Sequence, residues 1–174
     1  MNNMLIICGA DEIGNYCQSG VTHIICIRNP RAANIPPEWF TGEYLQLNFG
    51  DVNSESDAKA YNSRAPNTED ILTALEFSRK AWADEAAIIL VSCNYGASRS
   101  PALAYVLWAD KIGQGNEKDA LAHILDIRPQ AVPNNYVVEL GDSLLGRNGE
   151  LIAALKDFND ELTTMIEKNF KFNH

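Results

Sequence analysis

The sequence has few residues of the kinds that bind metals or form disulfides. Its 174 residues include only four cysteines and three histidines. No Cys-x-x-Cys pair occurs, so neither a zinc site nor a disulfide framework is expected. We therefore predict no metal and no organic cofactor. Free thiols are typical of a reducing compartment, which makes a cytoplasmic location the expectation.

Long hydrophobic runs are also missing. The first apolar segment, from Met4 to Cys8, is short and has no basic region before it, so no signal peptide is expected. No segment is long enough for a membrane span. Positive charge is scarce as well, because 14 Lys and Arg stand against 23 Asp and Glu, a net charge of −9. This balance argues against nucleic acid or a membrane surface as partner, although a small positive pocket remains compatible with it.

The remaining composition is that of an ordinary globular protein, with 46% hydrophobic and 21% charged residues. The length predicts a single domain over residues 1–174. Short apolar runs predict strands at 4–8, 22–27, 43–49 and 86–91. Helical patterns are expected at 11–19, 68–82, 101–112, 117–127, 135–145 and 150–169. The polar segment 50–67 has no periodicity and is expected to be a long loop.

The order of these elements predicts the fold class. Strands alternate with helices in the first half of the chain, and helices dominate the second half. This order is typical of an α/β fold with a central, mostly parallel sheet. We expect about four to five strands, flanked by helices.

The segment from Val91 to Ser100, VSCNYGASRS, is the strongest candidate for a functional site. It leaves an apolar strand, has a glycine near its middle and enters a helix that Pro101 begins, with Ser100 expected as the cap. A strand, a tight loop and a helix N-terminus together form an anion site, because backbone N–H groups converge where the helix dipole is positive. We therefore expect this loop to bind a phosphate-like group.

Each residue type in this loop has a chemical reason. A helix N-terminus and a nearby arginine lower the pKa of a thiol, so Cys93 is the expected nucleophile. Arg99 offers a planar fork that holds two phosphoryl oxygens through the transition state. Gly96 permits a close backbone approach or a positive φ. The hydroxyl of Ser100 can donate to the sulfur and ease its departure.

The remaining loop residues are expected to line the substrate site. Asn94, Tyr95, Ala97 and Ser98 bring no basic side chain, which makes polyphosphorylated lipids poor candidates as substrates. Tyr95 is interpreted either as part of the pocket wall or as a packing residue. The substrate-binding residues expected here are Asn94, Tyr95, Gly96, Ala97, Ser98 and Arg99.

This loop resembles the signature of the protein tyrosine phosphatase superfamily: His-Cys, five residues with glycine third, then Arg-Ser or Arg-Thr. Downstream, the stretch from Arg128-Pro129 to Pro133-Asn134, followed by Tyr136 and Leu140, is similar to one in dual-specificity phosphatases. More loosely, the chain looks like a bacterial group of predicted tyrosine phosphatases. The resemblance implies the cysteine-phosphatase fold and hydrolysis of phosphate monoesters through a phosphocysteine. Phosphotyrosine is the implied substrate, with phosphoserine and phosphothreonine as alternatives.

The resemblance also implies a general acid upstream of the nucleophile. In that family an aspartate on a loop before the cysteine protonates the leaving group and then activates water. Asp51 is the matching position, with Gly50 as a candidate hinge, while Glu55 and Asp57 are rivals in the same loop. Ser92 and Asn134 are expected to support the site.

The chain departs from the family pattern at Ser92, where the family usually has histidine. A serine cannot supply the same electrostatic effect, so we expect a thiolate pKa above the family's usual range and a slower enzyme. Two alternatives stay open: a catalytically weak pseudophosphatase that binds a phosphorylated partner, and a phosphatase for small metabolites. A further hypothesis makes Cys8 or Cys26 a resolving thiol for an oxidised Cys93.

Overall fold

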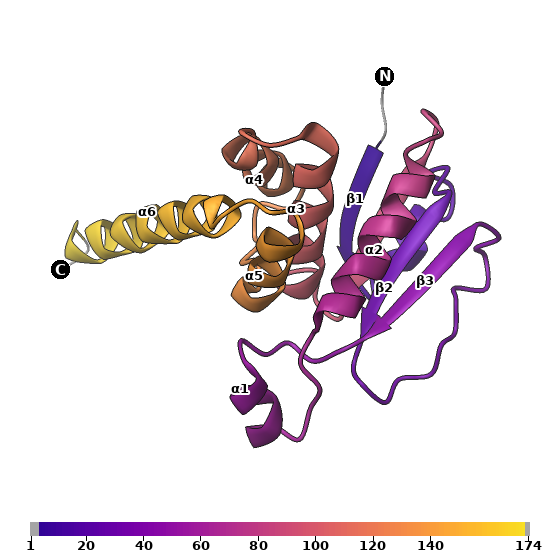
Figure 1. The fold of residues 1–174 in the computed structure, drawn as a ribbon, viewed down its shortest axis with the longest axis horizontal. Helices are drawn as coiled ribbons and strands as arrows, with labels where there is room; N and C mark the ends of the chain where they lie inside the picture. The colour runs from indigo at the N-terminus through magenta and orange to yellow at the C-terminus, as the bar shows by residue number, and fades with distance from the viewer. Residues whose placement is uncertain (1–3, 173–174) are drawn as a thin grey trace.

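A computed structural model of the chain describes residues 4–172. A sheet stands at one side of the molecule and the helices gather beside it (Figure 1). The strands are β1 (Met4–Gly9), β2 (His23–Arg28), β3 (Glu43–Asn48) and β4 (Ile88–Cys93). The helices are η1 (Ile13–Tyr16, a 3₁₀ turn), α1 (Glu55–Ala60), α2 (Thr68–Ala81), α3 (Arg99–Ile112), α4 (Glu117–Ile127), α5 (Asn135–Leu144) and α6 (Glu150–Phe172).

The four strands form one parallel sheet in the order β1-β4-β2-β3. Strand β4 lies between β1 and β2, with Val91 opposite both Ile7 and Ile25. Five of its six residues are buried, which agrees with its continuous apolar sequence. The predicted α/β class, the parallel sheet and the strand positions are confirmed. The ends of each strand lie within two residues of the predicted ends.

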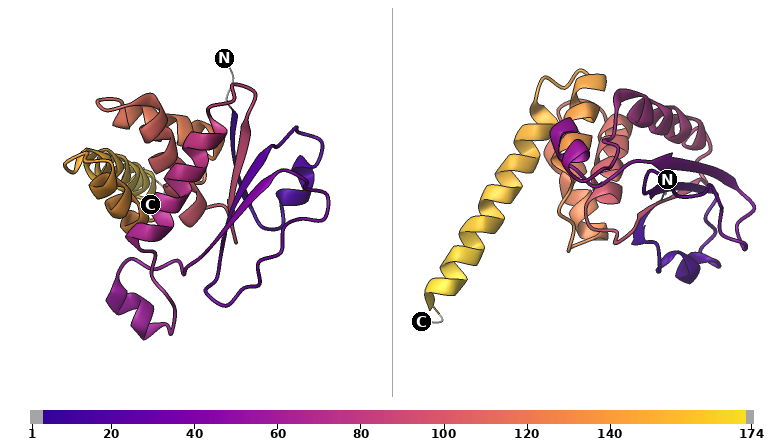
Figure 2. Two further views of the ribbon diagram at one scale, coloured as in Figure 1. Left: turned by 45° about the vertical axis from the view of Figure 1, so that its right-hand side comes forward. Right: turned by 90° about the horizontal axis from the view of Figure 1, so that it is seen from below.

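The two faces of the sheet are covered differently. Successive side chains of a strand point to opposite faces, so each strand contributes to two hydrophobic clusters. The larger cluster joins Ile7, Ile25 and Val91 to apolar side chains of α2 to α6. The smaller cluster, on the other face, joins Ile6 and other strand residues to η1 and to the loop that follows β2. The helices therefore lie mainly on one face (Figure 2).

Helix starts follow the local sequence, with one exception. Asn67 caps α2 in a reciprocal capping box with Asp70, and the Asn134 side chain caps α5. Helix α3 begins two residues before the predicted start at Pro101, and Ser98 occupies its N-cap position without a side-chain cap bond. The predicted cap at Ser100 is therefore wrong, because that hydroxyl is bonded to the Cys93 sulfur instead.

Two predictions for irregular segments also need correction. The expected long loop 50–67 contains α1, which Ser54 caps by accepting a hydrogen bond from the N–H of Asp57. The helix expected over 11–19 is only the short turn η1. Both segments are too short to show helical periodicity, so capping and tertiary contacts decide their conformation.

The C-terminal half is fixed by a buried ion pair. Arg147 donates to Glu117 at 2.9 Å and to the carbonyl of Ala109 at 2.8 Å, tying the start of α4 to the turn before α6. The first turns of helix α6 pack against α4 and α5, and the rest of the helix extends away from the other elements (Figures 1 and 2). Over residues 4–172, no helix combines the length and apolar character needed to cross a membrane.

Candidate active site

The site lies where the four parallel strands end. Strand β4 ends at Cys93, and Asp51, Asn29 and Glu12 follow β3, β2 and β1. Because the carboxyl ends of parallel strands share one edge of a sheet, segments far apart in sequence meet there. The predicted residues Cys93, Ser100, Arg99 and Asp51 come together at this edge.

The loop from Cys93 to Arg99 is called the Cys93 loop below. Its backbone carbonyls at residues 94–98 point away from the centre of the loop. Each of the carbonyls of residues 94–98 accepts a hydrogen bond from outside the loop. In loop order the donors are Ala10 N (3.1 Å), Arg128 Nη2 (3.1 Å), Arg128 Nε (3.1 Å), Val132 N (2.7 Å) and Asn134 N (3.2 Å). Since the carbonyls point outward, the loop offers N–H groups and not carbonyl oxygens to an anion.

Glycine at position 96 is required for two reasons. Its φ is +66°, a conformation that L side chains rarely adopt. A Cβ there would also lie 2.6 Å from the backbone of Cys8 and Gly9 and 2.8 Å from Arg128 Nη2. The loop therefore packs against β1 at a distance that only glycine allows.

Cys93 is buried, with 2% of its surface exposed, yet its sulfur is surrounded by donors. The Ser100 hydroxyl donates to Sγ at 3.2 Å. Burial by itself raises the pKa of the Cys93 thiol, but the hydroxyl and N–H of Ser100, the charge of Arg99 and the N–H of Gly96 outweigh it. The net result is a pKa below that of an ordinary thiol, which favours a thiolate.

Arg99 lies beside the loop with a buried and only partly satisfied guanidinium, 3% exposed. Its Nη1 donates to the carbonyl of Phe49 at 2.9 Å and to the side chain of Asn29 at 3.3 Å. Its Nε is buried and has no hydrogen-bond partner among residues 4–172. A buried donor without a partner is costly, and an oxyanion bound in the loop would satisfy it.

Asp51 faces the same space from the end of β3. Its Oδ1 accepts hydrogen bonds from the Ser98 hydroxyl at 2.7 Å and from Asn134 Nδ2 at 2.9 Å. Its Oδ2 lies 4.0 Å from Arg99 Nε. The two bonds to one oxygen fix the carboxyl group and leave the other oxygen toward the arginine.

The neighbouring glycine has a packing role. A Cβ at position 50 would lie 2.1 Å from Ser63 Oγ, and the N–H of Gly50 donates to the carbonyl of Arg64 at 2.7 Å. The chain after α1 therefore approaches Gly50 closely, and a side chain here would displace the Ser63 hydroxyl. The rival acids Glu55 and Asp57 lie in the first turn of α1, and no contact within the described residues joins them to Cys93 or Arg99.

Arg128 and Glu12 form a brace behind the loop. The two guanidinium nitrogens Nη1 and Nη2 lie 2.9 and 2.8 Å from the Glu12 carboxylate, which also accepts a hydrogen bond from the N–H of Gly9. The bond from Arg128, with that of Gly9, holds the pKa of Glu12 below its usual range. Of this brace, the sequence resemblance contained Arg128 but gave no sign of Glu12.

Ser92 does not touch the nucleophile. It lies on the other face of the sheet, where its Oγ and Cys26 Sγ are 3.0 Å apart. Cys8 and Cys26 belong to the smaller hydrophobic cluster, whereas Cys93 belongs to the larger one across the sheet. Burial raises the pKa of the Cys8 thiol to about 12, so this group is a poor partner for thiol exchange.

The other predicted residues lie as follows. Asn94, Ala97 and Ser98 form the loop wall, and the Tyr95 side chain is 83% exposed, which does not support packing as its role. Asn29 was missed, although its position directly after an apolar strand run was a usable signal. Among residues 4–172, no cluster of His, Cys, Asp and Glu is arranged to hold a metal ion.

Comparison with known proteins identifies the fold. No protein-family model matches the chain, and no curated protein matches its sequence. DUSP15 superposes with a TM-score of 0.62 at 19% identity, over 90% of this chain and 92% of its own. Human DUSP28 superposes with a TM-score of 0.60 at 17% identity, over 94% of this chain and 96% of its own. The human tyrosine phosphatase-like serine/threonine/tyrosine-interacting protein superposes with a TM-score of 0.59 at 24% identity, over 79% of this chain and 84% of its own.

These neighbours share the overall fold of this chain. Their identities, all below 25%, are too low to transfer an activity, but the superposition covers most of each chain. The α/β architecture with its four-stranded parallel sheet is therefore the fold of the dual-specificity and tyrosine phosphatases.

Proposed function

We propose that this protein is a cysteine-dependent phosphatase that hydrolyses phosphate monoesters through a phosphocysteine intermediate. The observation that carries the proposal is the Cys93 loop itself. Five outward carbonyls leave its N–H groups free to face an anion, next to a thiol of lowered pKa and an unpartnered, buried Arg99 Nε. No other described part of the chain combines a nucleophile with an anion site.

The reaction follows from the groups present. The Cys93 thiolate attacks phosphorus, the S–P bond forms and the P–O bond to the leaving group breaks. Asp51 gives its proton to the departing oxygen. Water then attacks the phosphocysteine and gives a proton to Asp51, the S–P bond breaks and inorganic phosphate leaves. The Ser100 hydroxyl stabilises the returning thiolate, and Arg99 holds the equatorial oxygens in both steps. The chain itself supplies the nucleophile, the cation and the acid that this reaction needs.

The proposed substrates are phosphotyrosine in a protein, with phosphoserine and phosphothreonine as further candidates. The structural neighbours include a mouse putative dual specificity phosphatase, which supports this range. Another neighbour, PTPMT1, was solved with PI(5)P, so a small or lipid-derived phosphate monoester is a second class to test. Apart from Arg99, the Cys93 loop has no basic side chain, which disfavours polyphosphorylated lipids.

A test uses phenyl phosphate, whose leaving group needs a proton, with the wild type, Cys93→Ser and Asp51→Asn. We expect vanadate-sensitive hydrolysis by the wild type, loss to background in Cys93→Ser and a fall of about 10²–10⁴-fold in kcat in Asp51→Asn. Radiolabelled phosphate trapped on Asp51→Asn, but not on Cys93→Ser, identifies the phosphocysteine. Circular dichroism of both variants checks that the fold is kept.

One structural neighbour is a tyrosine phosphatase-like serine/threonine/tyrosine-interacting protein, which supports the alternative of a phosphate-binding pseudophosphatase. This alternative predicts that the wild type binds vanadate or phosphate without any turnover. That result would overturn the proposed enzyme and leave a binding module.

A further inference from the structure

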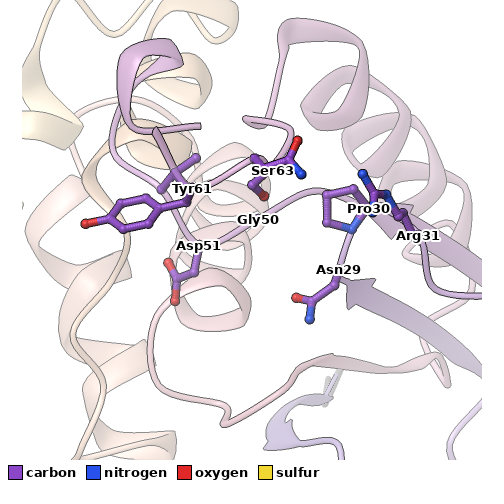
Figure 3. A pocket seen from close by; sticks show the side chains of 9 residues that line it. Asn29, Pro30, Arg31, Gly50, Asp51, Tyr61 and Ser63 are labelled. Carbon is purple, nitrogen blue, oxygen red and sulfur yellow. The ribbon is translucent and has the colours of Figure 1, made fainter. Parts of the chain in front are cut away.

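A cavity of about 500 Å³ opens next to Asp51. Three segments line this Asp51 cavity: the turn after β2, the end of β3 and the turn after α1 (Figure 3). Its lining residues are Asn29–Arg31, Gly50–Val52 and Tyr61–Ser63. The volume falls within the usual range for a small-molecule pocket, about 300–1,000 Å³.

The position of this cavity gives it a role in the proposed reaction, and the inference below rests on that function. An acid that protonates the leaving group must touch the bridging oxygen of the ester. With the phosphoryl group in the Cys93 loop and Asp51 at that oxygen, the group beyond the oxygen lies on the Asp51 side. The Asp51 cavity is therefore the space available for the leaving group.

The walls of the cavity combine apolar and polar groups, and their one cation is Arg31. The other polar side chains include the amides of Asn29 and Asn62 and the hydroxyl of Ser63, while Asp51 is the only acid in the lining. Arg31 is exposed and makes no side-chain hydrogen bond or ion pair with the residues that the structure describes. Its guanidinium is therefore available to an anion that enters the cavity.

We propose that Arg31 binds an anionic group on the leaving-group side, so that this protein prefers phosphate monoesters with a second negative charge near the ester oxygen. The guanidinium fork suits a carboxylate or a second phosphate. The second charge comes either from a residue next to phosphotyrosine in a peptide or from a small acidic metabolite. Tyr61, 77% exposed at the cavity rim, offers a flat apolar surface to the uncharged part of either.

The test compares two esters, phenyl phosphate and 4-carboxyphenyl phosphate, which differ in one carboxylate. The measured quantity is the ratio of their kcat/KM values, carboxylated over plain. We expect Arg31→Gln to lower this ratio about five- to tenfold, the size of an accessible charge-assisted contact. Lys59→Gln is the matched control, because it removes one positive charge from nearby α1 without touching the lining. In Lys59→Gln the ratio of the two kcat/KM values should stay within twofold of the wild-type ratio.

The outcomes separate this inference from the proposed function. Hydrolysis of both esters with an unchanged ratio in Arg31→Gln, or with an equal fall in Lys59→Gln, overturns the role of Arg31 alone. No hydrolysis of either ester by the wild type overturns the proposed function and this inference with it. Raised salt should reduce the wild-type ratio but not that of Arg31→Gln, because an exposed charge pair is screened.

A second pair of substrates identifies the source of the charge. Phosphotyrosine peptides with Glu or Gln beside the phosphorylated residue are compared in the wild type and in Arg31→Gln. A preference for Glu that Arg31→Gln removes assigns the site to acidic peptides. An effect on the aryl esters without an effect on the peptides assigns it to small acidic phosphates.

Discussion

The two walls of the candidate site are built in opposite ways. On the phosphate side, Cys93 and Arg99 are 2% and 3% exposed, and every outer carbonyl of the Cys93 loop is bonded. On the leaving-group side, the Asp51 side chain is 41% exposed and opens onto a cavity. The wall where charge develops is thus fixed before substrate arrives, as electrostatic catalysis requires. The wall that meets the rest of the substrate is open and can accept several leaving groups.

This contrast predicts two kinds of variant. Changes on the phosphate side should lower the rate for every substrate, because every monoester presents the same phosphoryl group. Changes on the leaving-group side should alter the order of preference among substrates. Four substitutions test this division.

Replacing Arg99 should have the largest effect. Arg99→Lys keeps the charge but loses the planar fork, so we expect kcat for 4-nitrophenyl phosphate to fall about 10²–10³-fold. The control is Arg79→Lys, which changes an exposed arginine paired with Asp110 on distant helices and should leave kcat within twofold. A loss below tenfold in Arg99→Lys would contradict a fixed phosphate wall.

The brace behind the loop should come next. Arg128→Lys cannot reach Glu12 and the carbonyls of Tyr95 and Gly96 together, so the loop N–H groups lose their alignment. We expect kcat to fall about 10–100-fold, with a smaller fall in Glu12→Gln, which keeps the arginine. Alkylation of Cys93 should need a higher pH in Arg128→Lys. A variant that is less stable but has unchanged kcat and an unchanged alkylation profile would make the brace purely structural.

Asn134 tests the leaving-group wall. Asn134→Ser removes the donor to Asp51 and leaves a hydroxyl that can still cap α5. We expect kcat to fall about tenfold for phenyl phosphate, whose leaving group needs a proton, and much less for 4-nitrophenyl phosphate. Equal losses for the two esters would show that Asn134 acts through the loop and not through the acid.

The smallest effect is expected at Ser100, since other groups also stabilise the thiolate. The pKa of Cys93 lies below that of an ordinary thiol, and the Ser100 hydroxyl is one cause. Ser100→Ala should therefore raise this pKa, so that less thiolate is present at each pH below it. The rate of alkylation by iodoacetamide should reach its midpoint at a higher pH. Ser98→Ala, whose hydroxyl bonds Asp51 and not the sulfur, should leave the midpoint in place.

Much of the fold could be predicted because its signals are local. The apolar runs of the four strands and the capping sequence of α2 each lie within a few consecutive residues. The segment 55–60 was misjudged as loop, because one and a half helical turns carry no periodicity. Asn29 and Glu12 were missed, because their contacts reach 70 and 116 residues along the chain. No sequence spacing encodes such a distance.

The sequence by itself determined the nucleophile candidate and its setting. Strand, cysteine, glycine, arginine and helix start follow one another within a single short segment, where backbone geometry is decided locally. Only the tertiary structure decided what turns the loop carbonyls outward, which acid faces Arg99 and where an unpaired Arg31 lies. These depend on four parallel strands that end at one edge of a sheet, and that meeting is a property of the packed chain, not of any one segment.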